Sequence, residues 1–325
     1  MRNNRYENIL DAIGRTPIVK LGNLSKGLKA TIWAKMEFMN PGGSTKDRIA
    51  KYMIEKAELE GKIKPGDTIL ENSSGNTAMG LAIVCRQKGY KLKIVIRDTT
   101  SKEKIKMLEV LGVDVLKVDA SLPPEDPDSY NLFAANLMKK EPSFYYIDQH
   151  GNLDNNETHY MTTGPEIWEQ MEGKIDYFVA AVGTGGTLCG AGKYLKEKNP
   201  DIKLIGIDPV GSVFYDWFKY KKMISPSRYF VEGMGDEFLI KTAQLDLLDD
   251  MIKVEDKKAF GWTKKIAFEE GILAGGSSGA NIYGAVQTAR KIDREANIVT
   301  LIPDSGYKYF STIYNDEWLE KNNLL

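Results

Sequence analysis

The sequence predicts an α/β protein with two open, mostly parallel twisted sheets and flanking helices. Short β-rich runs alternate with amphipathic helical runs along most of the chain, as in βαβ units, and the alternation resumes after the middle of the chain. Several of these β-rich runs are followed by turns rich in glycine, serine or asparagine that lead into the next helix. Two α/β halves with the active site in the cleft between them are therefore expected.

The individual elements follow from the same alternation. The predicted strands are residues 30–38, 68–71, 92–96, 113–118, 177–182, 203–208 and 297–302. The predicted helices are residues 44–61, 78–88, 188–198 and 257–271. The run of residues 121–128, which contains three prolines, predicts an exposed loop. In parallel sheets ligands bind at the carboxyl ends of the strands, so the turns that follow the strands are the first place to look for a site.

Composition excludes several classes of function. The chain has 325 residues and 42% hydrophobic content, enough for two cores. Its 44 basic and 45 acidic residues leave no positive excess to neutralise a polyanion, so a nucleic-acid partner is not expected. Since no apolar run is long enough to span a bilayer and no signal peptide is evident, we expect a cytoplasmic protein without a membrane partner. Two cysteines and two histidines predict neither a metal site nor a disulfide.

Lys46 is the first candidate for chemistry. It lies in the run Asn40-Pro-Gly-Gly-Ser-Thr-Lys-Asp-Arg48, where a glycine-rich turn meets the start of a predicted helix. Glycine lets the backbone approach a ligand, and a helix start offers unpaired N–H groups and a positive dipole. The alternative is a surface turn that caps the helix while Lys46 points into water.

A cluster of small polar residues forms the second candidate. Ser73, Ser74, Asn76 and Thr77 follow the predicted strand of residues 68–71 and precede a helix. Serine and asparagine are also the preferred helix caps, so a plain N-cap is the alternative. The run holds more small polar groups than one cap requires, and this favours a ligand site.

A glycine-rich loop forms the third candidate. It follows the strand of residues 177–182 and opens a helix, so its backbone N–H groups are suited to a phosphate. The loop consists of Gly183, Thr184, Gly185, Gly186 and Thr187. It matches neither a Walker loop nor a Gly-x-Gly-x-x-Gly fingerprint, because Leu188 stands in the place of the third glycine. Asp208 lies where a ribose-binding acid would, which leaves a dinucleotide as the alternative to a phosphate monoester.

The scarcity of typical catalytic side chains in the sequence indicates that a cofactor supplies the chemistry. Histidine is scarce, and the chain has neither a Gly-x-Ser-x-Gly elbow nor a metal triad at ligand spacing. Two further polar turns, residues 274–280 and 302–307, could reach the same ligand, although close packing of small residues is the alternative for the first. A lysine, a phosphate loop and a hydroxyl cluster together suit pyridoxal 5'-phosphate, which bonds to lysine and stabilises amino-acid carbanions.

The sequence resembles the fold-type II pyridoxal-phosphate enzymes of the cysteine synthase and cystathionine β-synthase family, which have a tryptophan synthase β-like fold. The resemblance runs from residues 9–19 through residues 40–48, 73–77 and 183–187 to residues 275–280. It implies that Lys46 forms the Schiff base and removes the Cα proton, and that Asn76 bonds the ring hydroxyl. It further assigns the phosphate to the loop of residues 183–187 and the pyridine nitrogen to Ser277. The residues implied for the substrate carboxylate are Ser73, Ser74, Thr77 and Gln149.

The resemblance also implies an activity and an organisation. The activity is β-replacement on L-cysteine or L-serine-type amino acids through an aminoacrylate, with an amino-acid thiol as nucleophile. Lanthionine or cystathionine is then the product, and hydrogen sulfide is released when cysteine is the donor. A homodimer is implied, with a smaller mobile domain of residues 42–150 and a larger domain of residues 1–41 plus 151–325. Regulation by adenosyl ligands is not expected, because the sequence shows neither a heme-binding extension nor tandem regulatory domains.

Departures from the family pattern bear on the second substrate. Ser73 and Ala78 replace the usual threonine and glycine of the carboxylate turn. Residues 231–238 are closer to the cystathionine synthase type, yet Asp236 stands where an aromatic residue is expected. Glu232 and Asp236 could receive the ammonium group of a second amino acid. The alternative is that both are solvated loop acids.

Rival functions remain within and outside the family. The family rivals are an O-acetylserine sulfhydrylase (cysteine synthase), a cysteine hydroxyl-lyase that gives serine and hydrogen sulfide, and a deaminase of the serine and threonine dehydratase type. Outside it are a catalytically silent binding protein and a nicotinamide dehydrogenase. The presence of Lys46 with its glycines argues against a silent protein.

Overall fold

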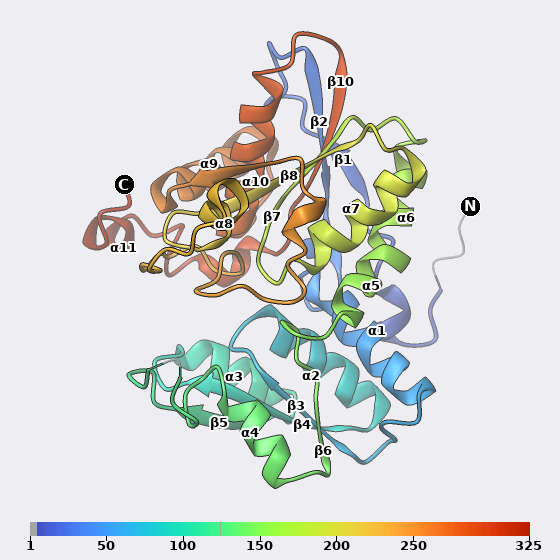
Figure 1. The fold of residues 1–325 in the computed structure, drawn as a ribbon, viewed down its shortest axis with the longest axis vertical. Coiled ribbons are helices and arrows are strands. Elements are labelled where there is room, and N and C mark those ends of the chain that lie inside the picture. The colour runs from blue at the N-terminus through green and yellow to red at the C-terminus, as the bar shows by residue number, and fades with distance from the viewer. Residues whose placement is uncertain (1–4, 124) are drawn as a thin grey trace. The chain divides into compact units, whose positions relative to one another are not determined.

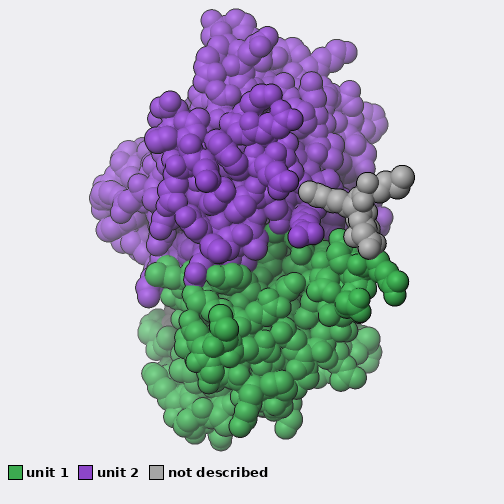
Figure 2. Space-filling view, turned by 90° about the vertical axis from the view of Figure 1, so that its right-hand side faces the viewer, with its two compact units in different colours: residues 1–14, 40–154 green, residues 15–39, 155–325 purple. Residues whose placement is uncertain are grey.

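The computed structural model describes residues 5–123 and 125–325, and the chain folds into two compact units. Unit 1 comprises Met1–Gly14 and Asn40–Asp154, and unit 2 comprises Arg15–Met39 and Asn155–Leu325. The units are coloured separately in Figure 2. The domain division expected from the resemblance differs in that it assigns residues 1–14, 40–41 and 151–154 to the larger part.

Unit 1 contains a four-stranded parallel sheet with helices packed on it (Figure 1). In spatial order its strands are β5 (Asp114–Val118), β4 (Lys91–Arg97), β3 (Thr68–Asn72) and β6 (Phe144–Tyr146). Its α-helices are α1 (Lys46–Leu59), α2 (Asn76–Lys88), α3 (Lys102–Val110) and α4 (Phe133–Lys140). The main core lies between the sheet and α1 and α2, and includes Ile49, Met53, Ile69, Leu81 and Ile94. This core fixes the starts of α1 and α2, where two of the predicted motifs lie.

Unit 2 contains a six-stranded sheet that is parallel except for its first pair. In spatial order its strands are β1 (Ile18–Lys20), β2 (Ala30–Lys35), β10 (Ala296–Leu301), β7 (Tyr177–Ala181), β8 (Lys203–Pro209) and β9 (Asp250–Val254). Only β1 and β2 are antiparallel. The helices α9 (Asp256–Glu270) and α10 (Gly276–Ala289) cover one face, and α6 (Thr163–Gln170) and α7 (Gly186–Lys198) cover the other (Figure 1). Two separate apolar cores result.

Shorter helices complete the two units. They are η1 (Ile9–Ala12), η2 (Glu37–Met39), α5 (Asp154–Met161), α8 (Phe214–Tyr220), η3 (Leu245–Leu247), η4 (Gly306–Tyr309) and α11 (Asp316–Lys321). In the described part of the chain, no helix is both long and apolar enough to cross a bilayer. Cys85 and Cys189 are both buried, unpaired thiols.

The predicted fold class is confirmed, and so are all seven predicted strands, with shifted ends. The first strand is shorter than predicted: it stops at Lys35, and residues 37–39 form η2 instead. The reason is that the chain turns after Lys35, where Met39 N–H bonds back to Met36 O at 3.1 Å and closes η2. Three strands, β1, β6 and β9, were not predicted.

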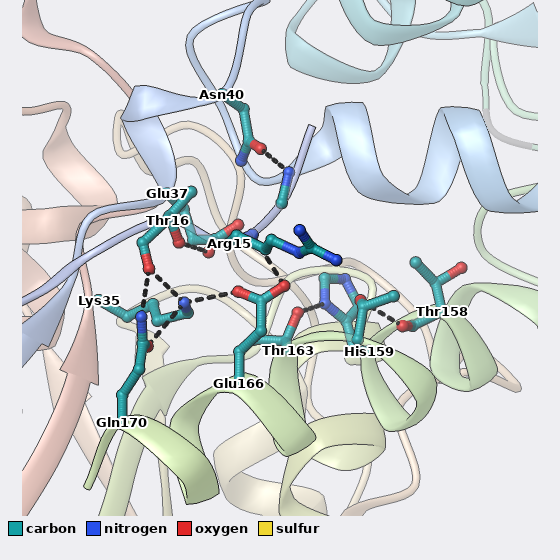
Figure 3. A network of polar contacts seen from close by, with 12 residues as sticks. Arg15, Thr16, Lys35, Glu37, Asn40, Thr158, His159, Thr163, Glu166 and Gln170 are labelled. Carbon is teal, nitrogen blue, oxygen red and sulfur yellow. Dashed lines mark hydrogen bonds and ion pairs between the residues drawn. The ribbon is translucent and has the colours of Figure 1, made fainter. Parts of the chain in front are cut away.

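A buried lysine ties β2 to α6 in unit 2 (Figure 3). Lys35 Nζ donates to Glu166 Oε2 at 2.7 Å, to Gln170 Oε1 at 3.0 Å and to the backbone oxygen of Thr16 at 2.6 Å. The other oxygen of Glu166 accepts the N–H of Arg15 at 2.9 Å. Lys35 is fully buried, so protein partners take the place of water around its charge.

Candidate functional site

Lys46 is the first residue of α1. The turn before it is closed by a hydrogen bond to the following residue, Asp47. The buried carboxylate of Asp47 accepts a hydrogen bond from the N–H of Gly42. A Cβ atom at position 42 would lie 2.5 Å from Asp47 Oδ1, so the turn requires glycine there. The turn therefore fixes Lys46, whose side chain is partly buried, at the helix start.

The start of α2 lies beside the start of α1. Gly80 lies one turn after Asn76, the first residue of α2, and a Cβ atom at Gly80 would lie 2.9 Å from the backbone oxygen of Lys46. Because this side chain is absent, the two helices approach to backbone contact. The structure thus brings Lys46 and Asn76, which come from separate motifs, to neighbouring helix starts.

Three residues predicted to bind a substrate carboxylate are buried together in unit 1. Ser73, Thr77 and Gln149 are each less than 10% exposed, and Thr77 Oγ1 donates to Gln149 Oε1 at 2.7 Å. Ser73 Oγ accepts the N–H of Gly75 at 3.3 Å, and Ser74 is partly buried in the same turn. Since the Gln149 oxygen is engaged by Thr77, its N–H groups are the donors that it can offer to a carboxylate.

Glu71, which was not predicted, lies under this polar cluster at the end of β3. It is fully buried, and its oxygens accept the N–H of Asn72 at 3.1 Å and the N–H of Gln149 at 3.3 Å. The side-chain amide of Gln149 makes a longer contact with Glu71, at 3.5 Å. Burial raises the pKa of Glu71 to about 8, and the charge of Asp148 adds to the rise.

A Glu71→Gln variant is expected to be more stable than the parent chain above pH 8 and nearly equal to it near pH 5. The folded-state pKa of about 8 exceeds the ordinary value of 4.5, so the unfolded chain releases a proton that the folded chain retains. The free energy of unfolding therefore falls as pH rises through this range, and glutamine removes that loss, roughly 5 kcal/mol for a pKa that rises from 4.5 to about 8. Urea unfolding at pH 5, 7 and 8.5 measures it. The exposed Glu103→Gln is the control, and a parallel pH dependence in Glu71→Gln would refute the assignment.

His150 was considered in the sequence only as a metal ligand, yet it lies close to Lys46. Burial lowers the pKa of His150 to about 4, and the charge of Lys46 lowers it further. The imidazole is therefore neutral at neutral pH and does not add a second positive charge beside Lys46. The signal in the sequence is its position directly after Gln149.

In unit 2, the glycine-rich loop connects β7 to α7. Gly185, the residue before α7, has φ +78°, and a Cβ atom there would lie 2.4 Å from Ala243 Cα. Cβ atoms at Gly183 and Gly186 would also collide with neighbouring atoms, at 2.3 Å and 1.9 Å. The loop is packed on its Cβ side, where Asn155 fills the place of a side chain at Gly186, and its backbone N–H groups lie at the start of a thirteen-residue helix. This geometry is typical of a phosphate site.

The loop that carries Glu232 and Asp236 packs against the glycine-rich loop. The N–H of Gly235 donates to Val182 O at 2.7 Å, and the Gly183 backbone is in contact with Gly233. Glu232 is exposed, whereas Asp236 is partly buried and its N–H donates to Ser212 Oγ at 3.1 Å. The structure therefore brings this acidic loop and the predicted phosphate loop together.

Ser277 lies in the first turn of α10 and is 6% exposed. One turn later, Asn281 Oδ1 accepts the N–H of Ala181 at 2.6 Å, which joins α10 to the end of β7 just before the glycine-rich loop. Ahead of Ser277, Gly275 contacts the buried pair in which Tyr309 donates to Asp304 Oδ2 at 2.7 Å. Burial raises the pKa of Tyr309, as do the charges of Asp304 and Glu232. The charge of Glu232 thus acts on Tyr309, which packs against Gly275.

Asp208, the acid on which the dinucleotide alternative depended, serves a different purpose. It is fully buried, and its Oδ2 accepts the N–H of Tyr215 at 2.9 Å in the first turn of α8. Burial raises its pKa to about 7. A carboxylate enclosed in this way caps a helix and cannot bond to a ribose. The dinucleotide alternative therefore lacks the ribose-binding acid that it requires.

The predicted site residues fall in both units. Unit 1 holds Lys46, Asn76, Ser73, Ser74, Thr77 and Gln149, and unit 2 holds the glycine-rich loop, Ser277, Glu232 and Asp236. Among residues 5–123 and 125–325, no group of three or more His, Cys, Asp or Glu side chains could hold a metal ion.

Comparison with known proteins identifies close relatives. The sequence family described as "Pyridoxal-phosphate dependent enzyme" matches residues 9–304. A cysteine synthase from Staphylococcus aureus is 42% identical over 96% of this chain and 98% of its own length. A cystathionine beta-synthase from Apis mellifera is 41% identical over 98% of this chain, which spans 63% of that relative's length.

A solved structure extends the similarity to three dimensions. The crystal structure of a hydrogen sulfide-producing enzyme from Fusobacterium nucleatum matches with a TM-score of 0.86 and 36% sequence identity. The match covers 94% of this chain and 99% of that one. Both α/β units thus have counterparts in one known enzyme.

Proposed function

Because the chain belongs to the pyridoxal-phosphate dependent enzymes, we propose that it carries out β-replacement on small amino acids. The proposed donor is L-cysteine or an L-serine-type amino acid, and the proposed nucleophile is an amino-acid thiol. Lanthionine or cystathionine is the product, and hydrogen sulfide leaves when cysteine is the donor. The proposal includes a cytoplasmic homodimer.

The residues present fit pyridoxal phosphate. The loop of residues 183–187 offers backbone N–H groups at the start of a thirteen-residue helix, and its three glycines have no room for a Cβ atom. We assign the phosphate to this loop, the ring hydroxyl to Asn76 and the pyridine nitrogen to Ser277. Lys46 bonds to the cofactor, as its fixed place at the start of α1 allows.

When bound, pyridoxal phosphate supplies an electron sink for the Cα–H bond that breaks. Lys46 Nζ receives the proton from the substrate Cα. Ser73, Ser74, Thr77 and Gln149 bind the substrate carboxylate and so hold the Cα–H bond toward Lys46. Ser277 would offer a hydroxyl instead of a carboxylate to the pyridine nitrogen, and this weaker partner would moderate the electron sink that the cofactor supplies.

The acidic loop is the single observation that carries the choice of nucleophile. Glu232 and Asp236 lie on the loop that packs against Gly183, and the charge of Glu232 acts on Tyr309, which packs against Gly275. Two carboxylates there suit the ammonium group of a second amino acid, which free sulfide lacks. The solved relative is described as a hydrogen sulfide-producing enzyme, and release of hydrogen sulfide here would follow from cysteine as the donor.

An O-acetylserine sulfhydrylase is the second candidate, because the cysteine synthase relative is similar over the whole chain. A cysteine hydroxyl-lyase, with water as the nucleophile, is the third. Incubation of the purified protein with cysteine alone distinguishes them by mass spectrometry. We expect lanthionine and hydrogen sulfide in equal amounts. Serine with sulfide would indicate the hydroxyl-lyase, and turnover only with O-acetylserine and sulfide would indicate the sulfhydrylase.

Replacing the two loop acids is expected to weaken binding of the second amino acid. Glu232→Gln and Asp236→Asn should each raise KM for homocysteine or the second cysteine about tenfold, because each removes one charge-assisted hydrogen bond. The KM for the donor and the rate of sulfide release at saturation should change little. Glu237→Gln, an exposed neighbour on the same loop, is the control. An unchanged KM in both variants would mean that the acids are solvated and that the thiol is bound elsewhere.

A further inference from the structure

His159 lies behind the glycine-rich loop, on the helix α5, and is fully buried. Its Nε2 is 3.1 Å from Thr187 Oγ1, and its Nδ1 is 2.8 Å from Thr163 Oγ1. Figure 3 shows the imidazole beside Thr163. Two threonine hydroxyls thus meet the two ring nitrogens, and one of these threonines belongs to the loop assigned to the phosphate.

The helix α7 packs closely against His159, which is 0% exposed. Helix α7 crosses α5 at Gly190, where a Cβ atom would lie 2.1 Å from Asn156 O and 3.1 Å from His159 Cβ. A Cβ atom at Gly186 would likewise collide with the side chain of Asn155. Helix α7 therefore packs directly against the turn of α5 that precedes His159. A side chain held this closely acts as a fixed part of the loop's support.

The other threonine of the loop is supported in the same way. Asn155 lies one turn before His159 on α5, and its Nδ2 donates to Thr184 Oγ1 at 3.0 Å. Thr184 Oγ1 also accepts the N–H of Gly186 at 3.4 Å. A hydroxyl that accepts from two protein donors directs its own hydrogen elsewhere. One face of α5 thus provides a partner to each threonine hydroxyl of the loop.

The direction of the hydrogen bonds decides what His159 does. A phosphate dianion only accepts hydrogen bonds, so Thr187 must donate its single hydroxyl hydrogen to bind it. Thr187 Oγ1 can then only accept from His159, which places the imidazole hydrogen on Nε2. Nδ1 then carries no hydrogen and accepts the hydroxyl hydrogen of Thr163. The bonds run in one direction, from Thr163 through His159 to Thr187.

We infer that His159 is a positioning residue for the cofactor phosphate: its Nε2–H, selected by Thr163, directs the Thr187 hydroxyl to the phosphate. The inference rests on the proposed function, in which the loop of residues 183–187 holds the phosphate. His159 acts only through that phosphate, so its effect must be absent with pyridoxal, which lacks the phosphate but keeps the aldehyde that bonds to Lys46.

The test measures the Kd of the apoenzyme for pyridoxal phosphate and for pyridoxal in four variants. Thr187→Val, His159→Leu and the double variant should each weaken pyridoxal phosphate binding about 10- to 100-fold, the loss expected for one hydrogen bond to a charged group. The double variant should be no worse than Thr187→Val, because both changes remove the same bond. His159→Gln, whose amide N–H can replace Nε2–H, should restore most of the affinity. Binding of pyridoxal should stay within about twofold throughout.

Different failures have different meanings. If Thr187→Val binds pyridoxal phosphate as tightly as the parent, the phosphate assignment is wrong and the inference falls with it. If Thr187→Val is weakened but His159→Leu is not, or if the two losses add, the phosphate assignment stands and the role of His159 is refuted. Equal loss of pyridoxal and pyridoxal phosphate would mark a purely structural effect. Should His159→Leu not fold, Thr163→Val provides a second test, because it has equal size and lies remote from the loop. It must still weaken binding of pyridoxal phosphate selectively. An unchanged 31P resonance of the bound phosphate in this variant would refute the role of His159.

Discussion

A Lys46→Ala variant is expected to fold normally and to lose turnover by at least about a thousandfold, together with the visible absorption of the bound cofactor. Lys46 is proposed both to bond to pyridoxal phosphate and to take the Cα proton, and the loss of a group with two such roles is severe. The substitution removes no apolar packing from the unit 1 core, so the stability of the fold should change little. Product formation by mass spectrometry and absorption of the purified protein measure the two losses.

Lys51 provides a matched control for this experiment. It lies on the same helix, also partly buried, and its Nζ donates to Leu10 O at 3.0 Å, within unit 1. Lys51→Ala should keep the visible absorption and the activity of the parent. A Lys46→Ala variant that still showed the absorption of lysine-bound cofactor would place the bond on another lysine and refute the central assignment.

Lys35→Met is expected to destabilise unit 2 by about 3–5 kcal/mol, the cost typical of breaking a buried ion pair. Lys35 is fully buried and donates to Glu166, Gln170 and Thr16 (Figure 3). Methionine fills much of the same volume but donates nothing, so the Glu166 carboxylate loses its counter-charge in a largely enclosed place. The shift in the urea midpoint of unfolding, with cofactor saturating, measures the effect.

A second substitution separates the lost charge pair from lost packing. The double variant Lys35→Met and Glu166→Gln should recover part of the lost stability, because it no longer leaves a single charge enclosed. Lys29→Met, which breaks an exposed pair with Asp293, should change the midpoint little. A double variant no more stable than Lys35→Met would indicate that the loss comes from packing.

The strands that the sequence did not predict share one property: β1, β6 and β9 are all edge strands. An edge strand has a neighbour on only one side and is less enclosed, so it lacks the continuous apolar run that marks a central strand. The three residues of β6 are only partly buried, and two of the three in β1 are exposed. The central strands, such as β7 and β10, were recognised because two neighbours and two helical layers enclose them.

The residues proposed to bind the ligand have a clearer signature in the sequence than those that support them. Lys46 and the loop of residues 183–187 lie in glycine-rich turns, which have a strong signature in the sequence. Glu71 and His159 have no such signature, because the role of a single buried acid or imidazole depends on partners that are distant in the sequence. The partner of Glu71 is 78 residues away and that of His159 is 28 residues away. Only folding brings these pairs together.

The place of β2 has a consequence for the order in which the chain acquires its structure during synthesis. β2 pairs with β10, so Ala30 lies opposite Ala296, and β10 in turn joins β2 to the rest of the six-stranded sheet. A nascent chain therefore carries β1 and β2 as an isolated hairpin until nearly all of the protein has left the ribosome. Residues 40–154, by contrast, can complete their own sheet as soon as β6 emerges. The edges of β1 and β2 therefore stay exposed until β10, the last strand in the chain, is synthesised and pairs with β2. Chaperones that cover exposed strand edges would protect the hairpin during that time.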